Sequence, residues 1–416
     1  MAVRPGTRIL QARSLKPDPE STTLPVASDI RRQRVLFVDD ESAILEGLRA
    51  VLRPQRREWD MVFALGGPAG QQEVESSNFD VVVTDMRMPI VDGAALLTRV
   101  KELQPRAVRL VLSGQTDPQT AMKSVFTAHQ FLAKPCDVEK LRSVVKRCCE
   151  LNELLAAEEL KSLAGDVSLL PAAPSTYLSI SKVVGDPSSG IQDVARIIER
   201  EPTLCAKLLQ VANSAFFGLP RAVSSISQAA TYLGALALRD LALAMETMAT
   251  AQGSSSAVSA TSYRAFQLNS LSVALLGRRW YASDRRKADD AFVAGMLRDM
   301  GHLVLSTRKE RSAGDAAQHA ALSAYLLGLW GIPHAVLEAV AYHEDPARVE
   351  HDALELMDVV HLCDALVGEV SPSPFQPPPT LDEARLGKLG VPAARILELR
   401  AQALGVLAEA REMLGK

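Results

Sequence analysis

The stretch VVVTDMRMP, residues 81–89, decides the fold of the first third of the chain. It is a short run of branched apolar residues that ends in Asp85 and a turn, which is typical of a buried parallel strand. Three further runs have the same character, namely VLFVDD (35–40), RLVLSG (109–114) and FLAKP (131–135). Because helical patterns separate the runs, residues 33–148 are predicted to form a doubly wound α/β domain with a five-stranded parallel sheet. The predicted helices of this domain include 43–52, 94–103, 116–127 and 138–150.

Polar residues stand where these runs end, and they are Asp39, Asp40, Asp85, Ser113 and Lys134. In an open parallel sheet, ligands bind beyond the carboxyl ends of the strands, so we expect these side chains to converge on one edge. Carboxylate oxygens suit Mg²⁺, and a carboxylate can accept a phosphoryl group when its charge repulsion is offset. Asp85 can then be the nucleophile, while Asp39 or Asp40 binds the metal ion. Lys134 can neutralise the developing phosphoryl charge, and Ser113 can donate a hydrogen bond to a phosphoryl oxygen.

With these residues in this order, residues 33–148 resemble the receiver domain of two-component response regulators. The match covers the acidic pair, the acceptor in TDMRMP, the following Gly93, the hydroxyl at Ser113 and the Lys134–Pro135 pair. The resemblance implies that a sensor histidine kinase phosphorylates Asp85.

The resemblance also implies roles for single residues. The implied Mg²⁺ ligands are the carboxylates of Asp39, Asp40 and Asp85 and the backbone carbonyl of Arg87. Ser113 and Phe131 would be the switch pair, with the ring turning inward when Ser113 engages the phosphoryl group. An aromatic residue in a strand is also typical of a core position, so a core role for Phe131 stays open. A cis peptide bond before Pro135 is implied as well.

The rest of the chain divides into segments of different character. Residues 1–32 are rich in Pro, Ser, Thr and Arg without periodicity, so we expect a disordered tail. Residues 149–164 are expected to form a linker helix, which could couple the domains, form a dimer or pack against its own domain. From 165 to 370 strand patterns vanish and helical spacing dominates, which predicts an all-α domain. A Pro-rich loop (371–380) and a helical extension (381–416) follow.

The helical part carries a second resemblance, in the segments 209–234, 291–301, 319–346 and 359–366. Together these segments are similar to the HDOD family, a branch of the HD hydrolase superfamily. The motifs NSAFFG (213–218) and LLGLWGIP (326–333) make the similarity specific. Active HD hydrolases hold one or two metal ions with His and Asp side chains from several helices, and the metals produce a hydroxide nucleophile.

The metal-ligand pattern of that superfamily is degenerate in this chain. The positions concerned are Asn269, Arg298, Asp299, His343 and Asp364, with His319 at a position that aligns less directly. The adjacent His–Asp pair of active enzymes reads Arg298–Asp299, and an earlier helical histidine reads Asn269. The downstream histidine pair reads His343–Glu344.

Arg298 decides how this pattern is interpreted. Arginine has no lone pair for a metal ion and stays protonated, so it opposes cation binding by charge repulsion. We therefore hypothesise that Arg298 replaces the metal and pairs with Asp364 or Asp299 inside the helical core. His319, His334, His343 and His361 are also compatible with ordinary core or surface roles.

Composition sets the remaining limits. The chain has 416 residues, of which 47% are hydrophobic and 23% charged, and a net charge of -3. These values fit a soluble multidomain protein and give no electrostatic reason to expect nucleic acid or an anionic membrane as a partner. Five cysteines without CxxC spacing predict reduced thiols in the cytoplasm. No apolar run is long enough to span a bilayer, and no signal peptide is apparent.

The leading functional hypothesis is a response regulator whose HDOD domain is not an enzyme but binds other signalling proteins. The expected cofactor is Mg²⁺ in the receiver domain, and the expected partners are a sensor histidine kinase and a downstream signalling protein, with a homodimer left open. The alternative is a metal-dependent phosphodiesterase that acts on a cyclic dinucleotide, which Arg298 and Asn269 oppose. DNA binding would require a basic helix in a helix-turn-helix, and the sequence offers none.

Overall fold

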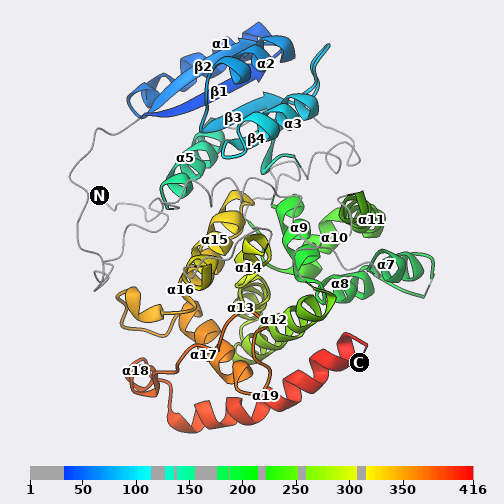
Figure 1. Ribbon diagram of the computed structural model, residues 1–416, viewed down its shortest axis with the longest axis vertical. Helices are drawn as coiled ribbons and strands as arrows, with labels where there is room; N and C mark the ends of the chain where they lie inside the picture. Colours follow the sequence, from blue (N-terminus) through cyan, green and yellow to red (C-terminus); the bar gives the residue numbers. More distant parts are fainter. Residues whose placement is uncertain are drawn as a thin grey trace.

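The computed structural model describes residues 32–113, 127–134, 138–154, 176–186, 188–213, 222–251, 259–306 and 315–415. Within these residues a parallel α/β domain, blue to cyan in Figure 1, is followed by a larger helical domain, green to red. This arrangement confirms the predicted combination of fold classes. The predicted tail, apart from Arg32, and residues 155–164 of the predicted linker helix lie outside the described residues.

Five parallel strands form one sheet, as predicted, and their order is β2-β1-β3-β4-β5. The strands are β1 (Gln33–Asp39), β2 (Trp59–Leu65), β3 (Val81–Asp85), β4 (Val108–Ser113) and β5 (Gln130–Ala133). The central strand β3 is buried along its whole length, which is why it reads as a continuous branched apolar run. In the register of β1 and β3, Val38 lies level with Thr84. Asp39 and Asp85 therefore end two neighbouring strands at the same edge.

Helices flank this sheet. They are α1 (Ser42–Val51), α2 (Gly67–Ser76), α3 (Gly93–Leu103) and α5 (Val138–Leu154), with a 3-10 turn, η1 (Arg53–Arg57). Three of the predicted helices correspond to α1, α3 and α5 with small shifts of their ends. α3 begins after Asp92, whose side chain caps it by accepting a 2.7 Å hydrogen bond from the Ala95 amide. The predicted helix 116–127 lies almost entirely outside the described residues.

The second domain is helical throughout the part that the structure describes. Its first helices are α7 (Thr176–Val184), α8 (Ile191–Ile198), α9 (Pro202–Ala212), α10 (Ile226–Leu233), α11 (Ala235–Ala251), α12 (Ala260–Trp280) and α13 (Arg285–Leu297). Its later elements are α14 (Met300–Leu305), α15 (Asp315–Leu329), α16 (His334–Tyr342), η4 (Pro346–Arg348), α17 (Leu356–Gly368), α18 (Glu383–Lys388) and α19 (Ala393–Met413). The central helices pack in pairs, α12 against α13 and α15 against α14 and α16, and enclose an apolar core.

The helical extension after residue 380 completes the second domain. α19 packs along α12 and α17, and its apolar face, which includes Leu399 and Val406, is buried. Ion pairs at its rim join Arg279 to Glu409 and Arg400 to Glu369. In the described part of the chain no helix is long and apolar enough to cross a membrane. The cysteines described there form no disulfide with one another, and they are Cys148, Cys149, Cys205 and Cys363.

Candidate functional site

The proposed phosphoryl acceptor and its partners meet at the carboxyl edge of the sheet. Asp39 ends β1 and Asp85 ends β3, and both side chains are buried. Lys134 follows β5 directly and reaches between them, with Nζ 2.6 Å from Asp39 Oδ2 and 2.5 Å from Asp85 Oδ1. The structure thus brings together three side chains that the sequence places at the ends of three separate strands.

Backbone groups fix the orientation of the two carboxylates. The Arg87 amide donates to Asp85 Oδ2 at 2.7 Å, and the Glu41 amide donates to Asp39 Oδ1 at 3.0 Å. Gly93 lies against the same turn, where a Cβ would stand 2.2 Å from the Asp85 carbonyl oxygen. A side chain at this position would displace the acceptor, so the close approach requires glycine.

Lys134 is a stable positive charge in this site. Burial by itself lowers the pKa of Lys134, but the hydrogen bonds to Asp39 and Asp85 outweigh burial and raise the pKa above its ordinary value. An ammonium group that bridges two carboxylates offsets their mutual repulsion. This offset is what an acceptor carboxylate needs before a negatively charged phosphoryl group can approach it.

The other predicted residues of the receiver site take different positions. Asp40, which directly follows β1, is exposed. Ser113 is the last residue of β4, and its backbone lies level with Ala133 of β5. Phe131 is buried in β5, which fits both a core residue and the inward position of a switch. Pro135 and the peptide bond before it lie outside the described residues.

Two side-chain amides join the receiver domain to the helical domain. Gln130 of β5 donates a 2.7 Å hydrogen bond from Nε2 to the carbonyl oxygen of Leu329, the last residue of α15. Gln210 of α9 donates to the carbonyl oxygens of Ala128 and His129, at 3.1 and 3.2 Å. All these bonds are buried, where a lost partner is costly, so they fix one specific arrangement of the two domains.

One apolar contact adds to this interface, and a buried lysine supports Gln210 from within the helical domain. Leu151 of α5 lies over Gly328 of α15, where a Cβ would stand 2.8 Å from both of its Cδ atoms. Lys207 is fully buried, donates to Gln210 Oε1 at 3.1 Å and lies 5.2 Å from the centre of the Trp330 ring. This bond directs the amide nitrogen of Gln210 toward the receiver domain. The sequence did not indicate this role of Gln210, because a single glutamine within an apolar helical segment does not mark a contact between domains.

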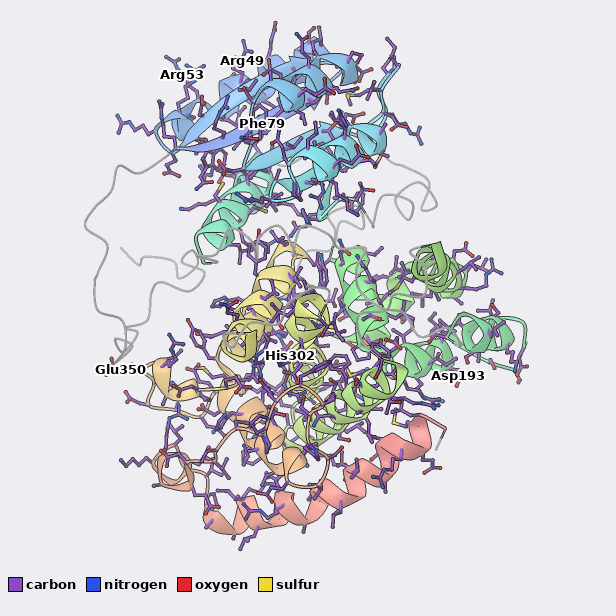
Figure 2. All side chains as sticks on the ribbon, viewed as in Figure 1. Arg49, Arg53, Phe79, Asp193, His302 and Glu350 are labelled. Carbon is purple, nitrogen blue, oxygen red and sulfur yellow. The ribbon has the colours of Figure 1, made fainter. Side chains whose placement is uncertain are left out.

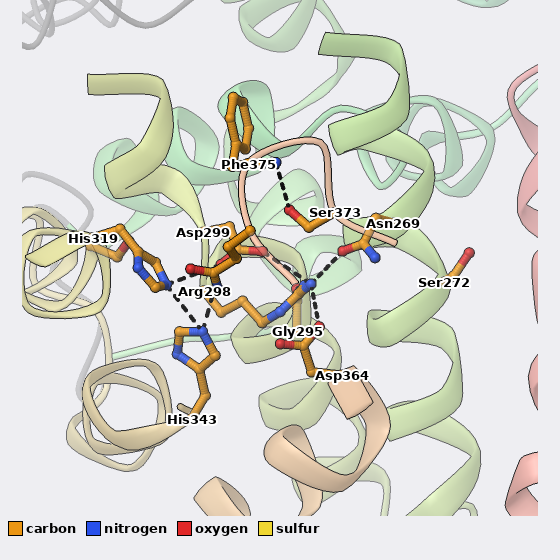
Figure 3. A network of polar contacts seen from close by, with 12 residues as sticks. Asn269, Ser272, Gly295, Arg298, Asp299, His319, His343, Asp364, Ser373 and Phe375 are labelled. Carbon is orange, nitrogen blue, oxygen red and sulfur yellow. Dashed lines mark hydrogen bonds and ion pairs between the residues drawn. The ribbon is translucent and has the colours of Figure 1, made fainter. Parts of the chain in front are cut away.

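Figure 3 shows a second polar network, which joins side chains from several helices of the second domain. Arg298, between α13 and α14, is fully buried. Its Nη2 lies 2.8 Å from Asp364 Oδ1 and 3.0 Å from Asp299 Oδ2, and it also donates to Asn269 Oδ1. Nη1 donates to the Gly295 carbonyl at 2.7 Å. The predicted pairing of Arg298 with Asp364 or Asp299 is confirmed, and both pairs exist together.

Asp299 divides its two oxygens between two groups of residues. Oδ2 faces Arg298, whereas Oδ1 lies 3.3 Å from His319 Nε2 and 3.6 Å from His343 Nε2. The two imidazole nitrogens are 3.4 Å apart, and His343 Nε2 is 3.1 Å from Glu344 Oε1. The two histidines and Asp299 are buried. A surface role, which the sequence left open for His319 and His343, is therefore excluded.

The charges of this network shift the pKa values of its members in opposite directions. Burial raises the pKa of Asp299, but Arg298 more than reverses this and holds the pKa well below its usual range. Burial raises the pKa of Asp364 although Arg298 acts against it. Burial lowers the pKa of His343, but Asp299 and Glu344 outweigh burial and raise it to about 10. The side of Asp299 that faces the histidines therefore attracts positive charge.

The Pro-rich loop closes over this network, a role that the sequence did not indicate. Phe375 stacks on His302, which lies in the middle of the helical domain (Figure 2), at a ring distance of 5.0 Å. His302 in turn stacks on His319 at 4.0 Å. Gln376 donates from Nε2 to Glu344 Oε1 at 2.6 Å. The loop thus supplies part of the wall of the site.

Comparison with known families identifies both parts of the chain. The response regulator receiver domain matches residues 35–146, and the HDOD domain matches residues 170–316. Similar curated proteins include the transcriptional regulatory protein ZraR of Escherichia coli O157:H7, which is 26% identical over 44% of this chain and 44% of its own length. The response regulator protein PilR of Pseudomonas aeruginosa is 26% identical over 45% of this chain and 46% of its own length. The chain thus spans less than half the length of these relatives.

Two solved structures with similarity to the chain cover different shares of it. The signal receiver domain of an HD domain-containing protein from Pseudomonas fluorescens Pf-5 is 27% identical, covers 30% of this chain and 98% of its own, and gives a TM-score of 0.28. The response regulator MmoQ of Methylococcus capsulatus is 23% identical, covers 55% of this chain and 97% of its own, and gives a TM-score of 0.42.

Proposed function

Because the chain carries a receiver domain followed by an HDOD domain, we propose that phosphorylation of Asp85 controls the binding of other signalling proteins by the helical domain. The observation that carries this proposal is the bridge of Lys134 between Asp39 and Asp85. It combines a buried acceptor, a second carboxylate and a fixed positive charge at one sheet edge.

The proposed phosphoryl donor is a phosphohistidine of a sensor kinase. An oxygen of Asp85 attacks the phosphorus, the new P–O bond forms, and the P–N bond to the imidazole of the donor breaks. Lys134 neutralises charge on the transferred group. The proposed Mg²⁺ ligands, the carboxylates of Asp39, Asp40 and Asp85 and the carbonyl of Arg87, are all oxygens, which fits this ion. When bound, Mg²⁺ would add positive charge beside the phosphoryl oxygens.

Strand β5 can carry a structural change from the phosphorylated edge to the helical domain. Lys134 directly follows this strand, Phe131 lies within it, and Gln130 at its start holds the Leu329 carbonyl of α15. A change at the phosphorylated edge that moves β5 would therefore alter the buried contact between the domains. Phosphorylation then shifts a population of domain arrangements, because the phosphoryl group favours one of them energetically.

The proposed output is protein binding and not hydrolysis. Arg298 supports this choice, because it brings a permanent positive charge to a position where active HD hydrolases have a metal ligand. Detectable cleavage of a cyclic dinucleotide that is lost in Asp299→Ala would favour the alternative, a metal-dependent phosphodiesterase.

The test compares three proteins: wild type, Asp85→Asn and the matched control Asp60→Asn, which changes an exposed aspartate of β2. Acetyl phosphate should label wild type and Asp60→Asn and leave Asp85→Asn unlabelled. Wild type loaded with beryllofluoride and Mg²⁺ should differ from Asp85→Asn in the proteins that it captures from the native cell extract. Labelling that persists in Asp85→Asn would place the acceptor elsewhere, and identical captures would mean that the receiver domain does not control binding.

A further inference from the structure

Helix α19 is apolar on two faces, and only one of them is covered in the part of the chain that the structure describes. The inner face packs on α12 and α17 and buries Ile396, Leu399, Ala403, Val406, Leu407 and Ala410. The outer face exposes five apolar residues, namely Ala394, Leu397, Ala401, Leu404 and Ala408. Leu397 and Leu404 are each 62% exposed. Apolar residues on both faces are typical of a helix that is buried on both.

The spacing of the five outer residues points to a second helix as the partner of this face. From 394 to 408 they follow one another at intervals of three and four residues in alternation. This is the pattern of the a and d positions of a heptad, in which an average interval of 3.5 residues keeps one seam turned toward a partner helix. In Figure 1, α19, drawn in red, lies at the edge of the molecule opposite the receiver domain, so a second helix can lie along it.

We propose that this outer face binds the same face of α19 in a second copy of the chain, as an antiparallel helix pair. The a positions hold alanines and the d positions hold leucines, and antiparallel pairing sets each d residue level with an a residue of the other helix. Leu404 then packs on Ala401 of the second copy, and Leu397 packs on its Ala408. A parallel pair would set alanine against alanine and leave gaps in those layers. This dimer goes beyond the proposed control of protein binding and does not depend on it.

Charges at the two ends of the seam fit the antiparallel orientation. Arg411 is exposed and stands at the next d position, where a parallel pair would set the two guanidinium groups side by side and in repulsion. In the antiparallel pair, Arg411 lies level with Ala394 of the second copy and about one helical turn from its Glu398. Glu398 is exposed and has an ion pair with Arg395 of its own helix, at 2.6 Å. Opposite charges therefore come within reach of one another at both ends of the pair.

Gly405 lies beside the seam, on the exposed side of α19. Nothing in the described part of a single copy requires a glycine there, because a Cβ at this position would meet no atom within 4 Å outside its own helix. A glycine inside a helix costs about 1 kcal/mol relative to alanine. In the helix pair the missing side chain lets the second backbone come close to this turn, as packing of leucine on alanine requires.

The test measures the mass of the full chain by sedimentation velocity from about 1 µM to about 200 µM, the range expected for a small interface. Wild type should change from monomer to dimer as its concentration rises. Leu404→Glu should weaken association by about 10-fold or more, because each dimer would bury two unpaired carboxylates. The matched control is Leu178→Glu, which changes a 59% exposed leucine of α7 and should associate like wild type. Circular dichroism should show the same helix content in all three proteins.

Two cysteine variants test the orientation, both with Cys136→Ser, since the other native cysteines are buried. Leu397→Cys and Ala408→Cys should each stay monomeric by non-reducing electrophoresis after mild oxidation. A mixture of the two should form a disulfide-linked dimer, because only antiparallel helices set these two positions opposite one another.

Three results would overturn the proposal. The first is wild type that stays monomeric over the whole range, and the second is Leu404→Glu that dimerises like wild type. The third is crosslinking of Leu397→Cys alone, or none in the mixture, since either would exclude the antiparallel pair.

Discussion

The side chain of Gln130 in the receiver domain donates a 2.7 Å hydrogen bond to the backbone carbonyl oxygen of Leu329 in the helical domain. Both residues are buried, and 199 positions of sequence separate them. Because side chains alternate along a strand, Gln130 and Phe131 point to opposite faces of the sheet. One short strand therefore carries the candidate switch residue on one face and the domain contact on the other.

The first prediction concerns this contact. Gln130→Ala removes the hydrogen bond that the receiver domain donates to the buried carbonyl oxygen of Leu329. The loss should lower the free energy of unfolding by about 1–3 kcal/mol, because a buried acceptor is left without this donor. Hydrogen exchange of α15 amides should speed up, and beryllofluoride should change that exchange less than in wild type. Gln228→Ala, at an exposed position of α10, is the control and should respond like wild type. If beryllofluoride changes α15 hydrogen exchange as much in Gln130→Ala as in wild type, this contact does not carry the signal from the receiver domain to the helical domain.

The second prediction concerns the charge between the two aspartates. Lys134→Met keeps the length of the side chain but leaves Asp39 and Asp85 without the ammonium that bridges them. Labelling of Asp85 by acetyl phosphate should slow by on the order of 100-fold, the scale on which one preorganised charge-stabilising donor contributes. Lys140→Met, an exposed lysine of α5, is the control. A labelling rate close to that of wild type would mean that Lys134 has only a structural role.

The site at the sheet edge of the receiver domain could be predicted from the sequence because each of its residues is marked by the short segment that precedes it. Asp39, Asp85 and Lys134 each follow a short apolar strand, and the topology of a parallel sheet then places all three at one edge. The resemblance to receiver domains added roles to these positions. What lay beyond prediction was the side-chain bridge itself, which depends on the register of β1 and β3 and on the reach of the lysine.

The helical site was predictable only in part. The sequence named Asp299, His343 and Asp364 as degenerate positions of the superfamily pattern and predicted that Arg298 pairs with an aspartate, and the structure confirms the pairing. It did not show that Asp299 uses its two oxygens for two different groups. Nor did it show that Gln376 in a Pro-rich loop closes the network, because a loop without periodicity does not indicate which helices it will cover.

The third prediction concerns pH. Burial raises the pKa of Glu201 to about 7, although hydrogen bonds from Tyr263, Thr203 and Gln267 act in the opposite direction. The folded protein thus keeps a proton that the unfolded chain, with an ordinary pKa of 4.5, releases at lower pH. The stability contributed by this carboxyl group is present below about pH 4.5 and falls as the pH rises to about 7, by up to about 3 kcal/mol.

Glu201→Gln should therefore reduce this loss, because a neutral amide does not ionise. The measurement is the unfolding midpoint of the helical domain by calorimetry at pH 5 and pH 8, and the difference between the two midpoints should be smaller in the variant. Glu412→Gln, at an exposed position of α19, should keep the wild-type difference. An unchanged difference in Glu201→Gln would show that the buried carboxyl group ionises normally.

The last prediction concerns the buried ion pairs of Arg298. Arg298→Met leaves Asp299 and Asp364 close together without their guanidinium, and removing one partner of a buried pair costs about 3–5 kcal/mol. Asp364→Leu should rescue part of this loss in the double variant, because it removes one of the two uncompensated charges. The free energy of unfolding in urea, measured for the single and double variants, gives the coupling between the two residues. A double variant that is no more stable than Arg298→Met would show that Asp364 does not depend on the guanidinium of Arg298.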